Sequence, residues 1–116
     1  MAKEKPDSDS IYNAIYDVVR CVPKGRVTSY GAVAAAIGVA SGARVVGYAM
    51  NNCHGLKPKV PAHRVVNRNG LLTGKHHFSP PEKMQQLLER EGIVIVDDAV
   101  VNFKTIFWDP AVELAL

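Results

Sequence analysis

Apolar residues near the start of the chain recur at the spacing of a helix. The apolar positions are Ile11, Ile15, Val18, Val19 and Val22. Asp9 or Ser10 can cap the N-terminus of this helix, and Pro23 and Gly25 end it. We therefore predict a helix that begins at Ser10 and opens a single domain of residues 10–116, after a mobile leader of residues 1–9.

The next segments predict two short helices. The alanine-rich stretch of residues 29–37 favours a helix, and Gly38 suits a left-handed cap at its end. Ser41 can cap a third helix over residues 42–51. Two short helices across a tight glycine-containing turn are typical of a helix-turn-helix, although a helix pair with only a structural role has the same spacing.

Turn signals then alternate with short apolar runs. The Asn69-Gly70 pair lies between apolar residues and predicts a tight turn with a short hairpin or wing. Residues 73–78 predict a loop, and a short tail is expected from Trp108 onward.

The last predicted helix is followed by strands. Ser79 to Glu82 has the spacing of a capping box, with proline at the helix start, and Gly92 ends the helix. Residues 93–96 and 100–103 predict strands on either side of an aspartate turn. The expected fold class is therefore mainly α with small β elements.

Composition narrows the class of protein. The 116 residues are 47% hydrophobic and 22% charged, as in an ordinary globular domain. No apolar run approaches the ~20 residues that cross a bilayer, and no export signal follows the N-terminal lysines, so we expect an intracellular protein without a membrane partner. Cys21 and Cys53 lack disulfide-framework spacing, so reduced thiols are expected.

The charges are segregated along the chain. No acidic residue lies between Asp17 and Glu82, so residues 18–81 carry a formal charge of +9 and the remaining residues −6 within the net +3. Such a field attracts phosphates and releases counterions from a polyanion. Nucleic acid is the leading candidate partner, and a solvated basic face without a ligand is the alternative.

One face of the predicted helix 42–51 suits close approach to a groove. Arg44, Gly47 and Asn51 lie at i, i+3 and i+7, and they offer a long cation, a bare backbone and an amide. In the alternative interpretation, Gly47 only permits tight helix packing and Arg44 is solvated. The helix has few side chains that read base edges, which speaks against a sequence-specific winged-helix regulator.

Four blocks of sequence carry a resemblance to a known family. Residues 60–67, Val-Pro-Ala-His-Arg-Val-Val-Asn, resemble the active-site signature Pro-Cys-His-Arg-Val of the O6-alkylguanine-DNA alkyltransferase family. Residues 22–31, 43–47 and 89–92 match further family blocks in order. The resemblance implies the C-terminal DNA-binding domain of that family alone, with a winged helix-turn-helix-like fold.

The cysteine position of the signature is occupied by Ala62. The family reaction needs a thiolate that attacks the carbon on guanine O6 and keeps the alkyl group. We therefore expect no enzyme activity and no catalytic residue, as in an alkyltransferase-like protein. The resemblance implies that His63, held by Glu91, would have activated the thiol; here both can persist as a structural hydrogen-bonded pair.

The resemblance also implies a DNA-binding surface. Tyr30 would press on the 3′ phosphate and help to rotate the target nucleotide, and Arg44 would enter the base stack from the minor groove and fill the gap. The other residues of this implied surface are Ser41, Gly42, Ala43, Gly47 and Asn51. Small residues there would let the backbone approach the phosphates.

The implied alkylguanine pocket combines several segments. Its residues are Tyr30, Ala62, His63, Val65, Gly74, Lys75 and His76. Ala62 leaves volume where a sulfur would stand, so larger alkyl groups could fit. Lys75 replaces a family tyrosine and could donate to O6 or to a phosphate, and Cys53 replaces an asparagine that supports the catalytic turn in active members.

Two further interpretations involve Cys53. It could accept the alkyl group in place of the missing thiol, although it lies nine positions from the active turn. It could also join a metal site with nearby histidines, but the spacing fits no zinc template. The candidate histidines are His54, His63, His76 and His77. We expect neither a metal nor a cofactor.

These observations predict a non-enzymatic DNA-binding protein. We expect it to bind double-stranded DNA that contains O6-alkylguanine, to extrude the lesion into a pocket and to hold it without repair. The complex would flag the site to other repair machinery, such as nucleotide excision repair proteins, by analogy with related proteins. We expect a cytoplasmic monomer, associated with the nucleoid if the protein is bacterial.

Overall fold

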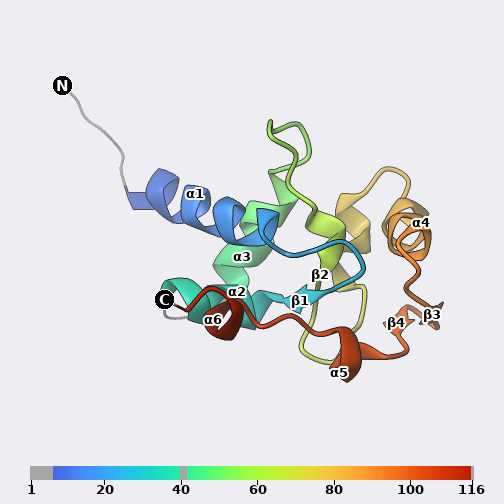
Figure 1. Cartoon of the computed structure of the whole chain (residues 1–116). Coiled ribbons are helices and arrows are strands. Elements are labelled where there is room, and N and C mark those ends of the chain that lie inside the picture. The colour runs from blue at the N-terminus through green and yellow to red at the C-terminus, as the bar shows by residue number, and fades with distance from the viewer. Residues whose placement is uncertain (1–6, 40–41, 116) are drawn as a thin grey trace.

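The computed structural model describes residues 7–39 and 42–115 (Figure 1). Helix α1 (Asp7–Arg20) begins three residues before the predicted start, so the boundary expected after residue 9 falls inside the helix. The remainder of the expected leader lies outside the described residues. Strand β1 (Thr28–Ser29) pairs in parallel with β2 (Val65–Val66), a pairing that sequence patterns did not predict.

Helices α2 (Tyr30–Ile37) and α3 (Gly42–Asn51) confirm the predicted helix pair. The Ser29 hydroxyl caps α2 by accepting a hydrogen bond from Ala32 N–H at 3.1 Å. Gly38 ends the helix at φ 71°, the left-handed conformation expected of it. Ser41, the expected cap of α3, lies outside the described residues.

The two helices cross closely at Gly42. A Cβ atom at this position would clash with the Cβ of Ala34 on α2. Gly42 is buried, so its missing side chain is what brings α3 against α2. The glycine thus sets the packing of the helix pair.

The hairpin of this domain lies at Asp97-Asp98 and not at Asn69-Gly70. Strands β3 (Ile95–Val96) and β4 (Ala99–Val100) pair in antiparallel fashion, and both turn aspartates adopt positive φ, at 52° and 62°. A turn does form at Asn69-Gly70, but Leu71 beyond it pairs with Ala99. The predicted hairpin is wrong because only the turn closes, with Asn67 N–H donating to the Leu71 carbonyl at 3.0 Å, and the segment after it bridges to Ala99 and not to β2.

The remaining elements differ from prediction mainly at their ends. Residues 73–78, expected to be a loop, contain the 3-10 helix η2 (Thr73–His77). Helix α4 (Glu82–Arg90) is confirmed, but the capping box is wrong, because Pro81 already has helical dihedrals and no side chain caps the helix. The strand predicted over residues 100–103 ends at Val100, where the chain turns into α5 (Phe103–Ile106).

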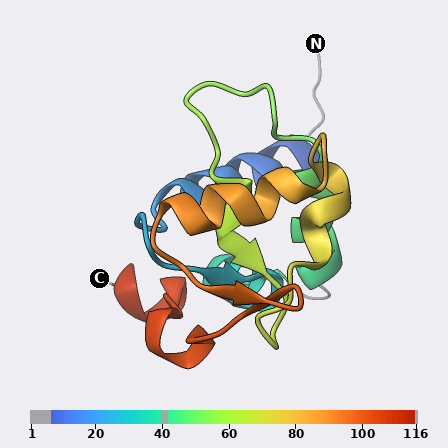
Figure 2. The same ribbon diagram turned by 90° about the vertical axis from the view of Figure 1, so that its right-hand side faces the viewer.

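Two clusters of buried side chains form the core. Helices α1, α2 and α3 pack together with β2, and this cluster includes Ile15, Val19, Val33, Val46, Met50 and Val65. Helix α4 covers the hairpin and the second cluster, which includes Val66, Met84, Leu88, Ile95 and Val100. Phe78 packs against both clusters and joins them. Figure 2 shows α4 in front of β2 and above the hairpin.

The C-terminal segment is attached to the edge of β1. Val27 bridges to Phe107 in parallel, and Trp108 N–H donates to the Val27 carbonyl at 2.7 Å. The Arg26 guanidinium donates to the carbonyls of Ile106 and Phe107. The predicted tail therefore runs beside β1 and ends in helix α6 (Pro110–Glu113), as Figure 1 shows.

Membrane-spanning potential is weak in this fold. Within residues 7–39 and 42–115, no single helix is long and apolar enough to cross a membrane. The bent pair of α2 and α3 passes such a test jointly, by length and composition only. Several apolar residues of this pair are buried in the core, as in the interior helices of a globular domain.

Glu91, directly after α4, holds three segments together. Its Oε1 accepts a hydrogen bond from Gly25 N–H at 2.9 Å, after α1. Its Oε2 lies 2.8 Å from Arg64 Nη2 and 2.7 Å from His63 Nε2, both in the 3-10 helix η1 (Ala62–Arg64). Arg64 also donates to the Val22 carbonyl at 2.9 Å. One carboxylate therefore fixes the position of η1.

The same contacts keep Glu91 ionised. Burial would raise the pKa of its carboxyl, but hydrogen bonds from Arg64, from Gly25 N–H and from His63 lower this pKa from 4.5 to about 2. Because the folded pKa is the lower one, Glu91 stabilises the fold above pH 4.5. This stabilisation is lost as the pH falls from about 4.5 to about 2.

We predict that Glu91→Gln lowers the free energy of unfolding by about 3 kcal/mol at pH 7, because Arg64 loses its buried carboxylate. The deficit should shrink as the pH falls below 4.5, since the carboxyl of the unfolded wild-type chain then binds a proton while the folded carboxylate does not. Urea denaturation at several pH values measures it. Glu89→Gln is the matched control and should stay within about 0.5 kcal/mol, because Glu89 is exposed. A deficit that is constant with pH would contradict the role of the charge.

We predict that Gly42→Ala destabilises the fold by about 1–3 kcal/mol, because the new methyl group meets Ala34. Gly47→Ala, on the same helix, is the control. A Cβ at Gly47 meets no atom within 4 Å, and alanine favours the helix by about 1 kcal/mol. Thermal unfolding of both variants measures the difference; equal effects would refute the close crossing.

Candidate functional site

A cavity of about 570 Å³ opens beside the turn η1. Pro61 precedes the turn and Ala62 begins it, with its side chain 7% exposed at the wall of the cavity. The turn is held from behind by Glu91, and β2 continues from it into the core. The volume of the cavity is within the range of small-ligand sites.

The cavity wall combines apolar and basic side chains. The apolar lining comes from Val60 and Ala62 of the turn segment and from Phe78 and Leu87 of later segments. His54 packs edge to face on Phe78, with ring centroids 4.8 Å apart. Basic side chains complete the lining, namely Arg20, Lys59, Arg64 and Lys83, together with His63 and His77. Such a site can hold a flat apolar group and favours negative charge over positive charge.

His63 forms the hydrogen bond to Glu91 that the sequence predicted. Burial lowers the pKa of His63 below its usual 6.5, although the Glu91 hydrogen bond acts in the opposite direction. The imidazole is therefore neutral at pH 7, and its Nε2 donates to the carboxylate. The pair orients the turn, while the atom that it would have activated is absent from Ala62.

Tyr30, at the start of α2, lies against η2. The ring is partly buried, and burial raises the pKa of its hydroxyl, so the phenol stays protonated. A Cβ atom at Gly74 would lie 2.5 Å from the Tyr30 hydroxyl oxygen. A side chain at position 74 would therefore have to displace the Tyr30 hydroxyl. The fold thus brings together Tyr30 and Gly74, two of the residues that the family resemblance assigns to the alkylguanine pocket.

Helix α3 exposes most of the predicted DNA-binding face. Ala43, Arg44 and Asn51 are exposed, and Gly47 faces open space. Gly42 differs, because it is buried against α2 and shapes the helix pair from inside. Ser41 lies outside the described residues. Sequence reasoning missed Tyr48, which is 55% exposed on this helix and adds an aromatic surface.

The predicted alkylguanine pocket is divided in this structure. Ala62 and His63 line the cavity, whereas Tyr30 and Gly74 lie outside its lining. Val65 is fully buried in β2, where the parallel pairing with β1 holds it in the core.

Lys75 and His76 also lie outside the cavity lining. The Lys75 ammonium lies 2.5 Å from the Asp98 carboxylate, which draws the side chain towards the hairpin. His76 is exposed on η2.

Cys53 is not placed to act as a nucleophile. Its thiol is buried and donates to the Met50 carbonyl at 3.3 Å, and it does not line the cavity. Burial raises the pKa of Cys53 to about 11, so the thiol is protonated at pH 7. Among residues 7–39 and 42–115, no group of three or more His, Cys, Asp and Glu side chains could hold a metal ion.

Sequence reasoning missed several residues that shape the site. Arg64 follows His63 directly in the Pro-Ala-His-Arg-Val block, but the sequence did not predict its ion pair with Glu91. Phe78 and the two lysines of the cavity, Lys59 and Lys83, come from separate segments. No local pattern connects these segments.

Comparison with known proteins supports one family. Residues 10–93 match the family model of the 6-O-methylguanine DNA methyltransferase DNA-binding domain. Alkyltransferase-like protein 1 of Schizosaccharomyces pombe is 34% identical over 96 residues, which cover 83% of this chain and 88% of that protein. The DNA base-flipping protein of Escherichia coli is 31% identical over 106 residues, which cover 87% of this chain and 76% of that protein.

The same similarity extends to enzymes and to a solved structure. Methylated-DNA--protein-cysteine methyltransferase of Salmonella typhimurium is 37% identical over 82 residues, but the chain covers only 46% of its length. A crystal structure of S. pombe Atl1 in complex with damaged DNA containing O6-carboxymethylguanine matches with a TM-score of 0.76 and 35% identity, over 86% of this chain and 95% of that chain. The mainly helical fold with small sheets is thus confirmed as the helix-turn-helix fold of the alkyltransferase DNA-binding domain, and the chain belongs to the 6-O-methylguanine DNA methyltransferase family.

Proposed function

We propose that this protein binds O6-alkylguanine in double-stranded DNA and holds the lesion without removing the alkyl group. The observation that carries the proposal is Ala62, which lines a cavity of about 570 Å³ where the family resemblance places the acceptor cysteine. This chain has the turn, the His63–Glu91 pair and the cavity, but no thiol at position 62. This arrangement supports binding of the lesion without transfer of the alkyl group.

Helix α3 is the proposed contact with the minor groove. The bare backbone at Gly47 permits close approach, and the formal charge of +9 over residues 18–81 draws the protein to the phosphates. Arg44 is exposed on this helix and is the proposed residue that fills the gap in the base stack. The crystal structures of Atl1 with DNA support this docking, since their fold matches over most of the chain.

Extrusion of the nucleotide supplies part of the selectivity. Flipping a base costs a few kcal/mol, and it costs least where pairing is already weakened, as in an O6-alkylguanine pair. Tyr30 lies at the start of α2, beside η2, and is the proposed residue that presses on the backbone. The flipped base then enters the cavity, where Val60, Phe78 and Leu87 offer apolar surface.

Alkyl transfer is not expected at this site. The reaction needs a thiolate within about 3 to 3.5 Å of the alkyl carbon. Ala62 has no sulfur, and the buried, protonated Cys53 lies outside the cavity lining. The similarity to alkyltransferase-like protein 1 supports the same conclusion.

A bound lesion that is not repaired must act through later events. We propose that the complex shields the base and flags the site to other repair machinery, such as nucleotide excision repair. This proposal implies a place beside the DNA, in the cytoplasm or nucleoid, and a single copy of the chain at each lesion.

The test of the function is a binding competition. We predict that the protein prefers a duplex with one O6-methylguanine over the same duplex with guanine, by at least tenfold at fixed salt. Fluorescence anisotropy with unlabelled competitors measures the preference. Fixed salt is essential, because phosphate contacts alone make affinity salt-dependent. Equal affinities would refute lesion recognition.

We predict that Arg44→Ala weakens binding to the lesion duplex by about 1–3 kcal/mol, because the gap in the stack is no longer filled. The control is Lys104→Ala on α5, which removes one positive charge outside the helix pair. The same anisotropy measurement on both variants separates the two effects. Equal losses for the two variants would show that Arg44 contributes only net charge.

A further inference from the structure

Helix α3 has one continuous stripe of positions that is open to solvent. Arg44, Tyr48 and Asn51 are exposed, and a Cβ atom at Gly47 would meet no atom within 4 Å. These four positions follow the spacing i, i+3, i+4 and i+7, which is the spacing of a single helix face. Val46 lies on the buried side of the same helix. Tyr48 therefore belongs to the face that carries Arg44.

Tyr48 is the large aromatic side chain of this open stripe. It is 55% exposed, and in the part of the chain that the structure describes no other aromatic ring packs against it. Tyr12 and Tyr16 differ, because their rings meet edge to face with centroids 6.1 Å apart. Aromatic residues also lose side-chain freedom in a helix. Neither core packing nor helix propensity therefore explains a ring at position 48.

The helix places Tyr48 one turn beyond Arg44. Side chains at i and i+4 lie one above the other on a helix surface. Four residues advance about 6 Å along the helix axis, and successive base pairs are stacked about 3.4 Å apart. The second base step from the gap that Arg44 fills extends from about 3.4 to about 6.8 Å. A helix that follows the groove thus places Tyr48 beside this second step.

We propose that the Tyr48 ring enters the second base step from the minor groove as a wedge, and that the protein therefore prefers lesions flanked by steps that open easily. The inference rests on the proposed function, in which α3 docks in this groove. The bare backbone at Gly47 lets the helix approach closely enough for the adjacent ring to reach the bases. Apolar wedges partly unstack a base step, and pyrimidine–purine steps such as TA unstack at the lowest cost.

A ring can distinguish flanking sequences in a way that charge cannot. Phosphates are alike at every step, so the contacts of basic side chains with the backbone carry no sequence information. The cost of unstacking a step depends on its sequence, and only a side chain inserted there meets this cost. The phenol hydroxyl is the other group that Tyr48 offers. A hydrogen bond from this hydroxyl to a phosphate would strengthen binding to every duplex equally.

The test compares two lesion duplexes of equal composition. One has the sequence 5′-TAGTA-3′ and the other 5′-AAGTT-3′, with O6-methylguanine as the central base. The steps next to the lesion are identical, and the second steps are TA in one duplex and AA or TT in the other. We expect the wild-type protein to bind the TA duplex about threefold or more tightly at fixed salt. This ratio should fall to about one in Tyr48→Ala and persist in Tyr48→Phe, which keeps the ring.

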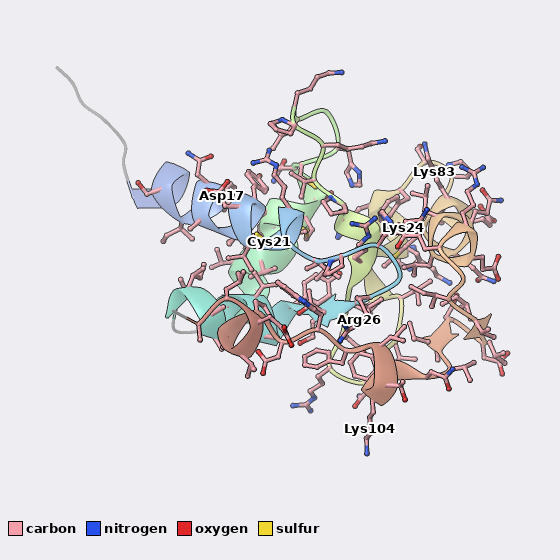
Figure 3. All side chains as sticks on the ribbon, in the orientation of Figure 1. Asp17, Cys21, Lys24, Arg26, Lys83 and Lys104 are labelled. Atoms are coloured by element: carbon pink, nitrogen blue, oxygen red, sulfur yellow. The ribbon has the colours of Figure 1, made fainter. Side chains whose placement is uncertain are left out.

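Two control variants should keep the wild-type ratio. Val94→Ala removes an apolar side chain of similar exposure, 56%, directly before β3. Lys104→Ala removes a positive charge that projects from α5 away from the rest of the chain (Figure 3). Tyr48→Ala should fold normally, because the ring is exposed and alanine favours a helix. Thermal unfolding followed by circular dichroism checks this.

The outcomes separate the wedge from the function on which it rests. A wild-type ratio of about one, with O6-methylguanine still preferred over guanine, would overturn the wedge and leave lesion binding intact. A ratio that persists in Tyr48→Ala would overturn the assignment to Tyr48, and an equal loss of the ratio in Tyr48→Phe would show that the hydroxyl acts and the ring does not. No preference for the lesion over guanine in either flanking sequence would overturn the proposed function itself.

Discussion

The carboxylate of Glu91 is the constraint on which the site depends. It accepts hydrogen bonds from Gly25 N–H, from Arg64 and from His63, so one side chain connects the segment after α1 with two residues of η1. A pKa of about 2 keeps it charged at physiological pH. In a chain without a thiol at Ala62, this network activates no nucleophile. Its contacts hold the turn at the wall of the cavity, which is the proposed place for the flipped base.

Next to that turn, helix α3 has a buried face and an exposed face, and the exposed face is the proposed contact with DNA. Helix α3 leaves Arg44 and Gly47 on an open face, while Gly42 at its start is used to bring the helix against α2. Two glycines on one helix thus serve different purposes. Cys53, which the sequence left as a rival nucleophile, is part of the core. Position 62 carries no thiol, while Arg44 and Gly47 remain accessible on α3 for the proposed contact with DNA.

Local sequence patterns predicted the helices well and the long-range pairings poorly. Alanines, Gly38 and the apolar spacing were enough for α1, α2, α3 and α4, because helix signals are local. The parallel pairing of β1 and β2 joins two-residue strands that are 37 positions apart, and strands so short have no periodicity. The Asn69-Gly70 turn was the stronger local hairpin signal, yet the hairpin lies at Asp97-Asp98, and Leu71 after the first turn bridges to Ala99 of that hairpin. The residues of the site followed from the Ala62 signature, whereas the division of the pocket and the lysines of the cavity depend on tertiary packing.

The central claim is that the protein recognises the lesion and leaves it chemically unchanged. The most direct measurement is the mass of the intact protein after incubation with one equivalent of O6-methylguanine duplex, together with nucleoside analysis of the recovered DNA. The account predicts an unchanged protein mass and full recovery of O6-methylguanine. A protein that gained the mass of one methyl group, with guanine restored in the DNA, would contradict it.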